Sequence, residues 1–248
     1  MFYYKGNLLC KLVFSLILTM SHVAMASSDV NEEAKATVEK TDLAIDQTNP
    51  YLMIKGSAEN TFKRLASEHQ AIRSNPNLLK EIVREELMPY INYKYAAFKV
   101  IGRYLKKTTD AERRAFVPVF REYLITAYAQ IFTLYDNQEV QFEPEKPFEG
   151  KRIIAVNTRI IMQDIDNINV AFKVRLNKKT KQWQAFDMVA EGVSLLDSKQ
   201  AELASIIRQK GLPYVTELLR KNSKRDIVFK DGGVQSEDTV IGTYKAKE

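Results

Sequence analysis

The chain has 248 residues, of which 45% are hydrophobic and 27% charged, and its formal net charge is +6. These proportions are typical of a globular protein and exclude a collagen-like or low-complexity chain. One Cys and two His exclude a Cys/His zinc site, a Cys-x-x-Cys redox pair and an internal disulfide framework. A phosphate-binding loop is excluded as well, because Gly150-Lys151 lacks the earlier glycine that the nucleotide-binding pattern requires.

Residues 1–26 predict a secretory signal peptide. Lys5 and Lys11 give a positive start, residues 12–20 form an apolar segment, and Ala24-Met25-Ala26 is a small-residue cleavage pattern. The alternative, a membrane anchor, needs about 20 apolar residues, which is more than this run contains. Cleavage after Ala26 leaves a chain with no Cys and one His, and export argues against nucleic acid as a partner.

Two polar stretches flank the part of the chain that we expect to fold. Residues 27–45 carry many charges and few large apolar side chains, so they predict a flexible leader. Residues 224–248 predict a polar, disordered tail, in which Ile227-Val228-Phe229 could still form a short docked piece. The region between them, residues 46–223, shows no internal repeat or second boundary and is predicted to be one domain.

Four helices are predicted at the start of this domain. Asn49-Pro50 and Asn75-Pro76 each place a capping side chain before a proline, which is a typical helix start. Pro89 is expected to end the second helix and to begin the third. The capping box Thr109-Asp110-Ala111-Glu112 starts the fourth helix, which Pro118 is expected to kink. Apolar residues three and four positions apart define the buried faces of these helices: Ala58, Phe62, Leu65; Leu79, Ile82, Val83, Leu87; Tyr90, Tyr93, Ala97, Val100, Ile101, Tyr104; and Phe116, Phe120, Tyr123, Leu124, Tyr128, Ile131.

The pattern then changes from helical spacing to alternation. Residues 140–142, 154–160, 170–176 and 183–190 predict strands with short connections, hence one antiparallel sheet with one face in water. In the last of these strands, strict alternation puts Trp183, Ala185, Asp187 and Val189 on one side.

Two further helices are expected after the sheet. Asp197 is predicted to start the first of them and Gly211 to end it, and Leu212-Pro213 opens the second. Helices, then an antiparallel sheet, then helices again define the α+β class.

Two residues offer acid–base chemistry. His69 lies at the polar end of the first helix, where an exposed helix-end residue is the favoured interpretation because no Ser or Cys nucleophile stands nearby. Asp187 lies in an apolar strand, and the favoured interpretation is pairing with a helix amide or a lysine. The alternative for Asp187 is the catalytic base of a small pocket enzyme, such as an isomerase.

Aromatic residues concentrate between Tyr90 and Phe142. Core packing explains part of this concentration. The alternative is the wall of a pocket for a lipophilic ligand, since Tyr and Met suit a site with one apolar and one wet end.

Several local strings resemble the MlaC family of periplasmic phospholipid carriers, also called toluene-tolerance auxiliary proteins. The string Trp183 to Ser194, WQAFDMVAEGVS, is similar to that family's last strand at nearly every position. The resemblance runs from about Asp46 to Ser223, and residues 27–45 and 224–248 are longer than the family norm. Shorter similar strings are Asp46-Gln47-Thr48-Asn49-Pro50-Tyr51, Ile72-Arg73-Ser74-Asn75-Pro76, Leu87-Met88-Pro89-Tyr90 and Phe120-Arg121-Glu122-Tyr123-Leu124.

The resemblance implies a sheet like that of nuclear transport factor 2, capped by helices, with acyl chains in a cavity between the layers and the headgroup in water. It implies a monomeric, non-enzymatic periplasmic protein with phospholipid as its ligand and without cofactor or metal. It also implies two partners, an outer-membrane lipoprotein–porin complex and the MCE-domain subunit of an inner-membrane ABC transporter. The implied role is maintenance of outer-membrane lipid asymmetry.

A phospholipid carrier needs a long apolar cavity, because each methylene removed from water contributes about 0.8 kcal/mol. Among the candidate lining residues, Val193 matches a pocket position of the family, and the others follow from the apolar stripes. A ligand-free interaction adaptor with a solid core is the remaining alternative. The predicted lining is Val83, Leu87, Tyr90, Ala97, Val100, Ile101, Phe120, Tyr123, Leu124, Val156, Phe172, Val174, Met188 and Val193.

Overall fold

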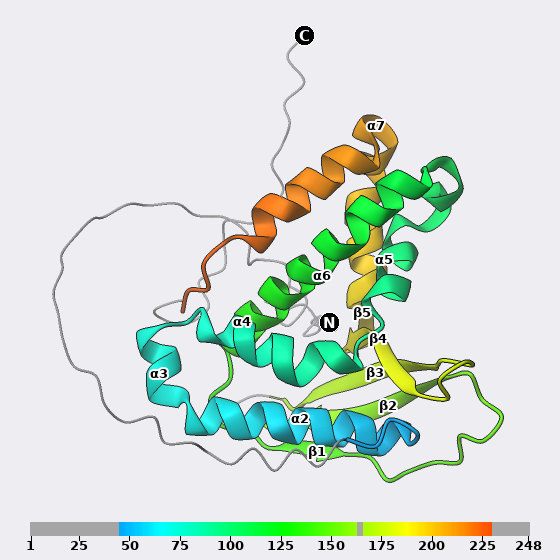
Figure 1. Ribbon diagram of the computed structural model, residues 1–248. Coiled ribbons are helices and arrows are strands. Elements are labelled where there is room, and N and C mark those ends of the chain that lie inside the picture. The colour runs from blue at the N-terminus through cyan, green and yellow to red at the C-terminus, as the bar shows by residue number, and fades with distance from the viewer. Residues whose placement is uncertain (1–44, 163–165, 230–248) are drawn as a thin grey trace, which may run out of the picture.

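A computed structural model of the protein describes residues 45–162 and 166–229 (Figure 1). The signal peptide, almost all of the expected leader and residues 230–248 lie outside the described residues. In the described part, helices precede an antiparallel sheet and a long helix follows it, which confirms the α+β class. In chain order the helical elements are α2 (Pro50–Ser67), α3 (His69–Ser74), α4 (Leu78–Ile82), the π-helix η1 (Val83–Leu87), the 3-10 helix η2 (Met88–Tyr90), α5 (Tyr93–Ile101), the 3-10 helix η3 (Gly102–Lys107), α6 (Asp110–Phe132) and α7 (Leu195–Ser223).

Two helix starts follow the predicted caps. The Asn49 side chain accepts hydrogen bonds from the backbone N–H groups of Tyr51 and Leu52, at 2.8 and 3.2 Å. Thr109 and Glu112 form the complete capping box of α6. These side chains satisfy N–H groups that the first turn of a helix leaves without partners.

Two other helix boundaries differ from the prediction. The helix expected to end at Pro89 passes through the π-turn η1 into η2, which contains Pro89. Helix α5 begins at Tyr93, after the cap Asn92, whose side chain accepts from the Tyr95 N–H at 3.1 Å. The helix expected to start at Asp197 begins three residues earlier, at the cap Ser194. In both cases a polar side chain nearer the actual start accepts a first-turn N–H group.

The helix end predicted at Gly211, with a new helix from Leu212-Pro213, is a kink inside the single element α7. Gly211 has φ 78° and ψ 171°, a backbone conformation that is essentially restricted to glycine, and Pro213 follows in the next turn. Figure 1 shows the two arms of α7 at a sharp angle, the first near the sheet and the second beside α6. By contrast, α6 continues as one helix through Pro118.

The sheet has five strands in chain order, and every neighbouring pair is antiparallel. Such a meander is what short connections between alternating segments predict. The strands are β1 (Val140–Phe142), β2 (Ile153–Ile160), β3 (Ile168–Leu176), β4 (Trp183–Ala190) and β5 (Val193–Ser194).

The prediction that side chains alternate strictly along β4 was wrong. Lys173 of β3 lies opposite Asp187, but its neighbour Val174 lies opposite Ala185, so Phe186 is an extra residue in β4. This β-bulge reverses the alternation, because cross-strand partners share a face. Asp187 therefore lies on the opposite face from Trp183 and Ala185.

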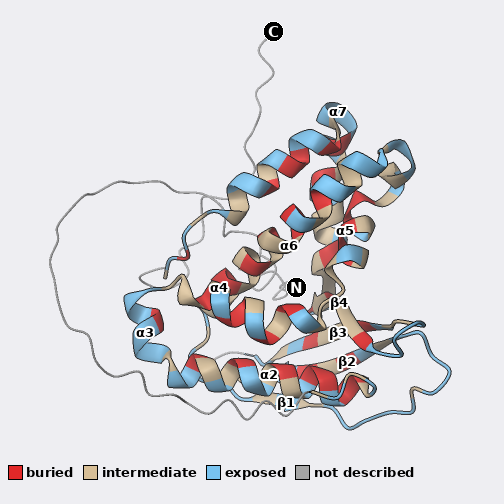
Figure 2. Ribbon diagram, viewed as in Figure 1, coloured by how far each residue is buried: buried red, intermediate tan, exposed pale blue. Residues whose placement is uncertain are grey.

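The buried side chains form three separate clusters. The largest joins α5, α6 and α7. The second joins the end of α2 to α4, η1 and the second half of α6. The third joins the first half of α2 to the sheet through Tyr51, Met53 and Ile54. Figure 2 shows buried residues along the facing sides of these elements.

The first residues of the expected polar tail pack against the helices. Ile227 is 2% exposed and belongs to the second cluster. Gln130 on α6 pairs with both backbone groups of Val228, donating to its carbonyl at 2.7 Å and accepting from its N–H at 3.3 Å. Asn77 accepts from the Ile227 N–H at 3.1 Å, and the Arg73 guanidinium lies 4.4 Å from the Phe229 ring centre. Residues 227–229 are thus a docked segment, which we call the C-terminal strap.

Candidate functional site

One face of the sheet carries a continuous apolar surface. Because paired residues share a face, the register of all four strand pairs defines one row of side chains across the five strands. A second row lies beside it. We call these two rows the apolar face; they are Phe142, Thr158, Val170, Ala190 and Val193, and Val156, Phe172 and Met188.

Helix α2 closes only part of the apolar face. Val156 is 1% exposed against Tyr51, Met53 and Ile54 of α2. Met188 and Val193 are only half-buried, and neither belongs to any of the three clusters of the described residues. At the β4–β5 end of this face, apolar side chains therefore remain partly exposed, because no other described element packs fully over them.

An open hollow of about 700 Å³ lies at the other end of the apolar face, between α2 and β1. Val140 and Phe142 of β1 form one wall, and Phe62 of α2 and Tyr135, whose ring centres are 5.0 Å apart, form another. The rim carries Lys55, Glu59, Gln138, Glu139 and Gln141. Its size falls within the range of small-molecule sites, which are typically about 300–1,000 Å³.

The structure divides the predicted lining residues among three places. The strand candidates Val156, Phe172, Val174, Met188 and Val193 all lie on one face of the sheet, as the register shows. Tyr90 packs against the same cluster as Val156 and Val174. The helical candidates lie elsewhere: Ala97, Val100, Ile101, Phe120, Tyr123 and Leu124 belong to or pack against the α5–α6–α7 cluster, and Val83 and Leu87 to the α2–α4–α6 cluster.

The predicted lining residues also differ in exposure: some are half-buried, so that a ligand could reach them, and others are fully buried by neighbouring helices. Ala97 and Val100 are fully buried in helix–helix contacts, and Ile101 is 1% exposed. The half-buried candidates are Leu87, Tyr90, Leu124, Phe172, Met188 and Val193. That any of these residues contacts a ligand stays a prediction.

Asp187 holds the sheet and the start of α7 together. Its carboxylate accepts a hydrogen bond from the Ser194 hydroxyl at 2.7 Å and from the Leu196 N–H at 3.1 Å, and the Lys173 ammonium lies 2.9 Å away. The Asp187 side chain is only 2% exposed. The favoured interpretation, a strand aspartate paired with a helix amide and a lysine, is confirmed.

Tyr128 on α6 is a half-buried tyrosine whose hydroxyl has a raised pKa. Burial, followed by the nearby Asp187 and Tyr123, raises the pKa of its hydroxyl to about 12. Yet the residue keeps intermediate exposure, and its hydroxyl has no hydrogen-bond partner among the described residues.

Lys199 lies beside Tyr123, which is one of the groups that raise the pKa of Tyr128. Its ammonium is 5.3 Å from the Tyr123 ring centre, and it pairs with Glu202. Burial alone would lower its pKa, but Tyr123 and Glu202 raise it, so Lys199 remains a cation. Polar groups thus occur beside the apolar interior, as an amphipathic ligand would require.

Titration should detect the environment of Tyr128. A tyrosine whose folded-state pKa is about 12 contributes stability that is fully present below the unfolded value near 10 and is lost as pH rises between those values. We expect the ultraviolet titration of the folded protein to show a late phenolate phase that disappears in Tyr128→Phe. Tyr214→Phe, which removes the hydroxyl of a 41% exposed tyrosine, should leave that phase unchanged. Persistence of the phase in Tyr128→Phe would contradict the assignment.

His69 is exposed at the start of α3, as expected for a helix-end residue. Within residues 45–162 and 166–229, no cluster of His, Cys, Asp and Glu has the composition of a metal site. In the same ranges, no helix combines the length and apolar character needed to cross a bilayer.

The sheet and its helices define an α+β protein with an apolar face that packing leaves partly uncovered. A family model described as MlaC protein matches residues 55–221. The intermembrane phospholipid transport system binding protein MlaC of Haemophilus influenzae is 33% identical over 190 residues, which cover 76% of this chain and 89% of that protein. The chain belongs to the MlaC family.

Two further relatives extend the comparison. The toluene tolerance protein ttg2D of Pseudomonas putida is 19% identical over 172 residues, covering 68% of this chain and 78% of that protein. The phospholipid-binding protein from Ralstonia solanacearum, solved in complex with a phospholipid, has a similar fold, with a TM-score of 0.61 and 16% identity. That similarity covers 70% of this chain and 96% of the Ralstonia chain.

Sequence reasoning missed the α2–β1 hollow. Phe62 was identified as a helix-face residue, and nothing in helical spacing shows that it borders open space. The aromatic-rich stretch was the available signal, since Tyr135 and Phe142 both fall within it.

Proposed function

We propose that the protein is a non-enzymatic periplasmic carrier that binds phospholipid by its acyl chains and shuttles it between outer-membrane and inner-membrane complexes. Membership of the MlaC family supports this proposal, because the Haemophilus relative is named for intermembrane phospholipid transport and the Ralstonia structure contains a phospholipid. The observation that carries it here is the apolar face, with Met188 and Val193 left outside the packed clusters.

The energetics fit this surface. Two ordinary acyl chains hold roughly thirty methylenes, and full exposure of these to water would cost on the order of 20 kcal/mol. The α2–β1 hollow and the half-buried β4–β5 end lie at opposite ends of the apolar face, and each offers apolar side chains that an acyl chain could cover. The headgroup would stay at the polar side, near water.

The partners follow from the same proposal. They are an outer-membrane lipoprotein–porin complex and the MCE-domain subunit of an inner-membrane ABC transporter, and the role is to maintain outer-membrane lipid asymmetry. In such a system the transporter hydrolyses ATP, and the carrier supplies a water-excluding surface.

Val193→Glu tests the proposal. A carboxylate on the apolar face would lie against acyl chains, where an unpaired charge is costly, so we expect the folded variant to lose its co-purifying lipid almost completely. The measurement is mass spectrometry of organic extracts of the native and variant proteins. The matched control is Ile153→Glu, which adds the same carboxylate at a 49% exposed position on the opposite face of the sheet and should retain lipid.

Three results would contradict the carrier proposal. Lipid retained at the native level in folded Val193→Glu would remove the apolar face as the binding surface. Native protein without any lipid would favour a ligand-free adaptor. Turnover of a small molecule that is lost in Asp187→Asn, with lipid retention unchanged, would instead favour an isomerase-like enzyme.

A further inference from the structure

Two loops at one end of the sheet bring basic residues together. The β2 start and the β3 end are paired, with Ile153 opposite Arg175 and the Leu176 N–H donating to the Arg152 carbonyl at 3.0 Å. The β3–β4 turn continues from there through three lysines. We call this group the basic tip; its members are Lys151, Arg152, Arg175, Lys178, Lys179 and Lys181, all exposed.

The cations of the basic tip are not neutralised within the described residues. None of the six forms an ion pair there. Lys151 donates to the Pro147 carbonyl at 2.9 Å, and the Arg175 guanidinium lies 4.4 Å from the Tyr95 ring centre. Of the carboxylates between β1 and β2, Glu143 pairs with Lys146, Glu145 accepts from the Asn49 amide at 3.1 Å, and Glu149 forms no ion pair within the described residues.

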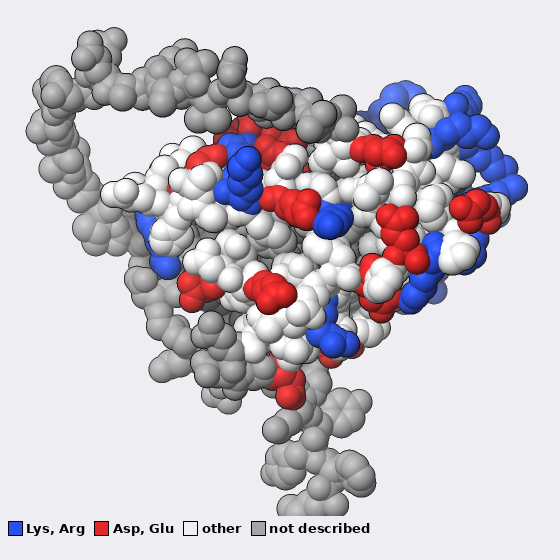
Figure 3. All heavy atoms as spheres, turned by 90° about the horizontal axis from the view of Figure 1, so that it is seen from below, with Lys and Arg blue, Asp and Glu red and all other residues white. Residues whose placement is uncertain are grey.

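The distribution of charge over the molecule is uneven. Basic side chains gather at the right-hand end of Figure 3, the end where Figure 1 draws the loops between the strands. Elsewhere, cations such as Arg64 and Arg84 pair with two or more carboxylates. The positive potential of the basic tip is therefore available to an external anion.

We propose that the basic tip docks the protein on the surface of an anionic phospholipid bilayer. A flat surface fits better than an acidic protein for two reasons. All six members of the tip are exposed residues in or next to two loops, an arrangement that suits a broad charged surface better than a single protruding side chain. Four of the six cations are lysines, which act as point charges and not as bidentate forks.

An exposed apolar side chain accompanies the charges. Ile153, next to Arg152, is 49% exposed. Basic residues beside an apolar side chain are a typical combination for binding at the headgroup level of a membrane. The docking goes beyond lipid carriage, because it does not require that the apolar face hold a ligand.

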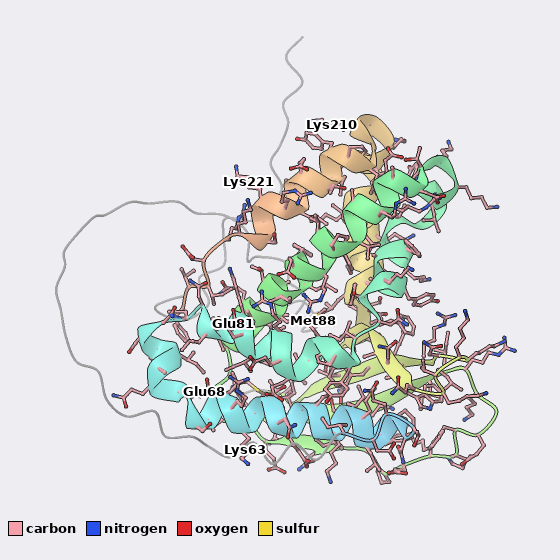
Figure 4. All side chains as sticks on the ribbon, viewed as in Figure 1. Lys63, Glu68, Glu81, Met88, Lys210 and Lys221 are labelled. Carbon is pink, nitrogen blue, oxygen red and sulfur yellow. The ribbon has the colours of Figure 1, made fainter. Side chains whose placement is uncertain are left out.

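Vesicle binding tests the docking. The tip variant is Lys178→Gln, Lys179→Gln and Lys181→Gln together. The control variant is Lys63→Gln, Lys210→Gln and Lys221→Gln, which removes the same charge at sites away from the strand loops (Figure 4). Each protein is sedimented with vesicles of equimolar phosphatidylglycerol and phosphatidylethanolamine at low ionic strength, and with phosphatidylcholine vesicles for comparison.

Each basic residue near an anionic membrane surface is worth about fivefold in binding. We therefore expect the tip variant to bind phosphatidylglycerol vesicles roughly tenfold to a hundredfold more weakly than the native protein, with the control close to native. Native binding should also fall steeply with added salt.

Several results would overturn the docking proposal. Equal loss in both variants would show a general effect of net charge, and native-like binding by the tip variant would remove the tip from the interaction. Equal native binding to phosphatidylcholine would exclude an electrostatic mechanism, and absence of native vesicle binding with retained binding to an acidic protein would assign the tip to a protein partner. Co-purifying lipid, measured on the same samples, reports on the carrier proposal separately and should not change in the tip variant.

Discussion

Replacing Asp187 by alanine should lower the free energy of unfolding by about 3 kcal/mol. The substitution leaves three donors without their acceptor: the Lys173 ammonium, the Ser194 hydroxyl and the Leu196 N–H. The value is at the low end for a broken buried ion pair, because 36% of the Lys173 side chain remains exposed and water can solvate its charge. Urea denaturation followed by circular dichroism measures the change.

Asp197→Ala is the matched control for this experiment. Asp197 is an exposed carboxylate in the first turn of the same helix, so its loss should cost no more than about 1 kcal/mol through the helix dipole. Similar denaturation midpoints for native protein and Asp187→Ala would show that the three contacts of Asp187 do not stabilise the fold.

Ending the chain at Ser223 should destabilise the protein by about 3–5 kcal/mol. The deletion removes Ile227 from its cluster, and burial of such a side chain contributes about 1.5–3 kcal/mol. It also leaves the amide groups of Gln130 and Asn77 without the backbone partners that the C-terminal strap provides, at about 1 kcal/mol each.

The comparison chain ends at Phe229 and keeps the whole strap. We expect its denaturation midpoint to equal that of the full chain, while the chain ending at Ser223 unfolds at a lower urea concentration. Hydrogen exchange should locate the loss in α3 and α4, which the strap contacts through Arg73 and Asn77. Equal midpoints for the two shortened chains would show that strap docking contributes nothing to stability.

Features with a local cause could be predicted from the sequence. The Asn49 cap and the Thr109–Glu112 capping box depend on residues within one turn, and both are present. The four strand segments follow from alternation, and their register gathers the strand candidates on a single face, because the side-chain period of a strand is two.

Features with a distant cause could not be predicted. The bulge at Phe186 arises from pairing with β3, and no residue near Phe186 indicates it. Helical spacing identified Ala97 and Val100 as buried, but it does not tell whether another helix or a ligand covers them, and here other helices do. The family resemblance supplied Val193, which the apolar stripes alone would not have singled out.

The elbow at Gly211 links two anchored ends of one long helix. Asp187 fixes the beginning of α7 to the sheet, and beyond the end of α7 the chain is fixed again by Asn77 at Ile227 and by Arg73 at Phe229. The angle at residue 211 therefore determines where the chain emerges beside α3 and α4. Any side chain there would disfavour the positive φ, so a substitution at residue 211, remote from the apolar face, would displace the strap from α3, α4 and α6.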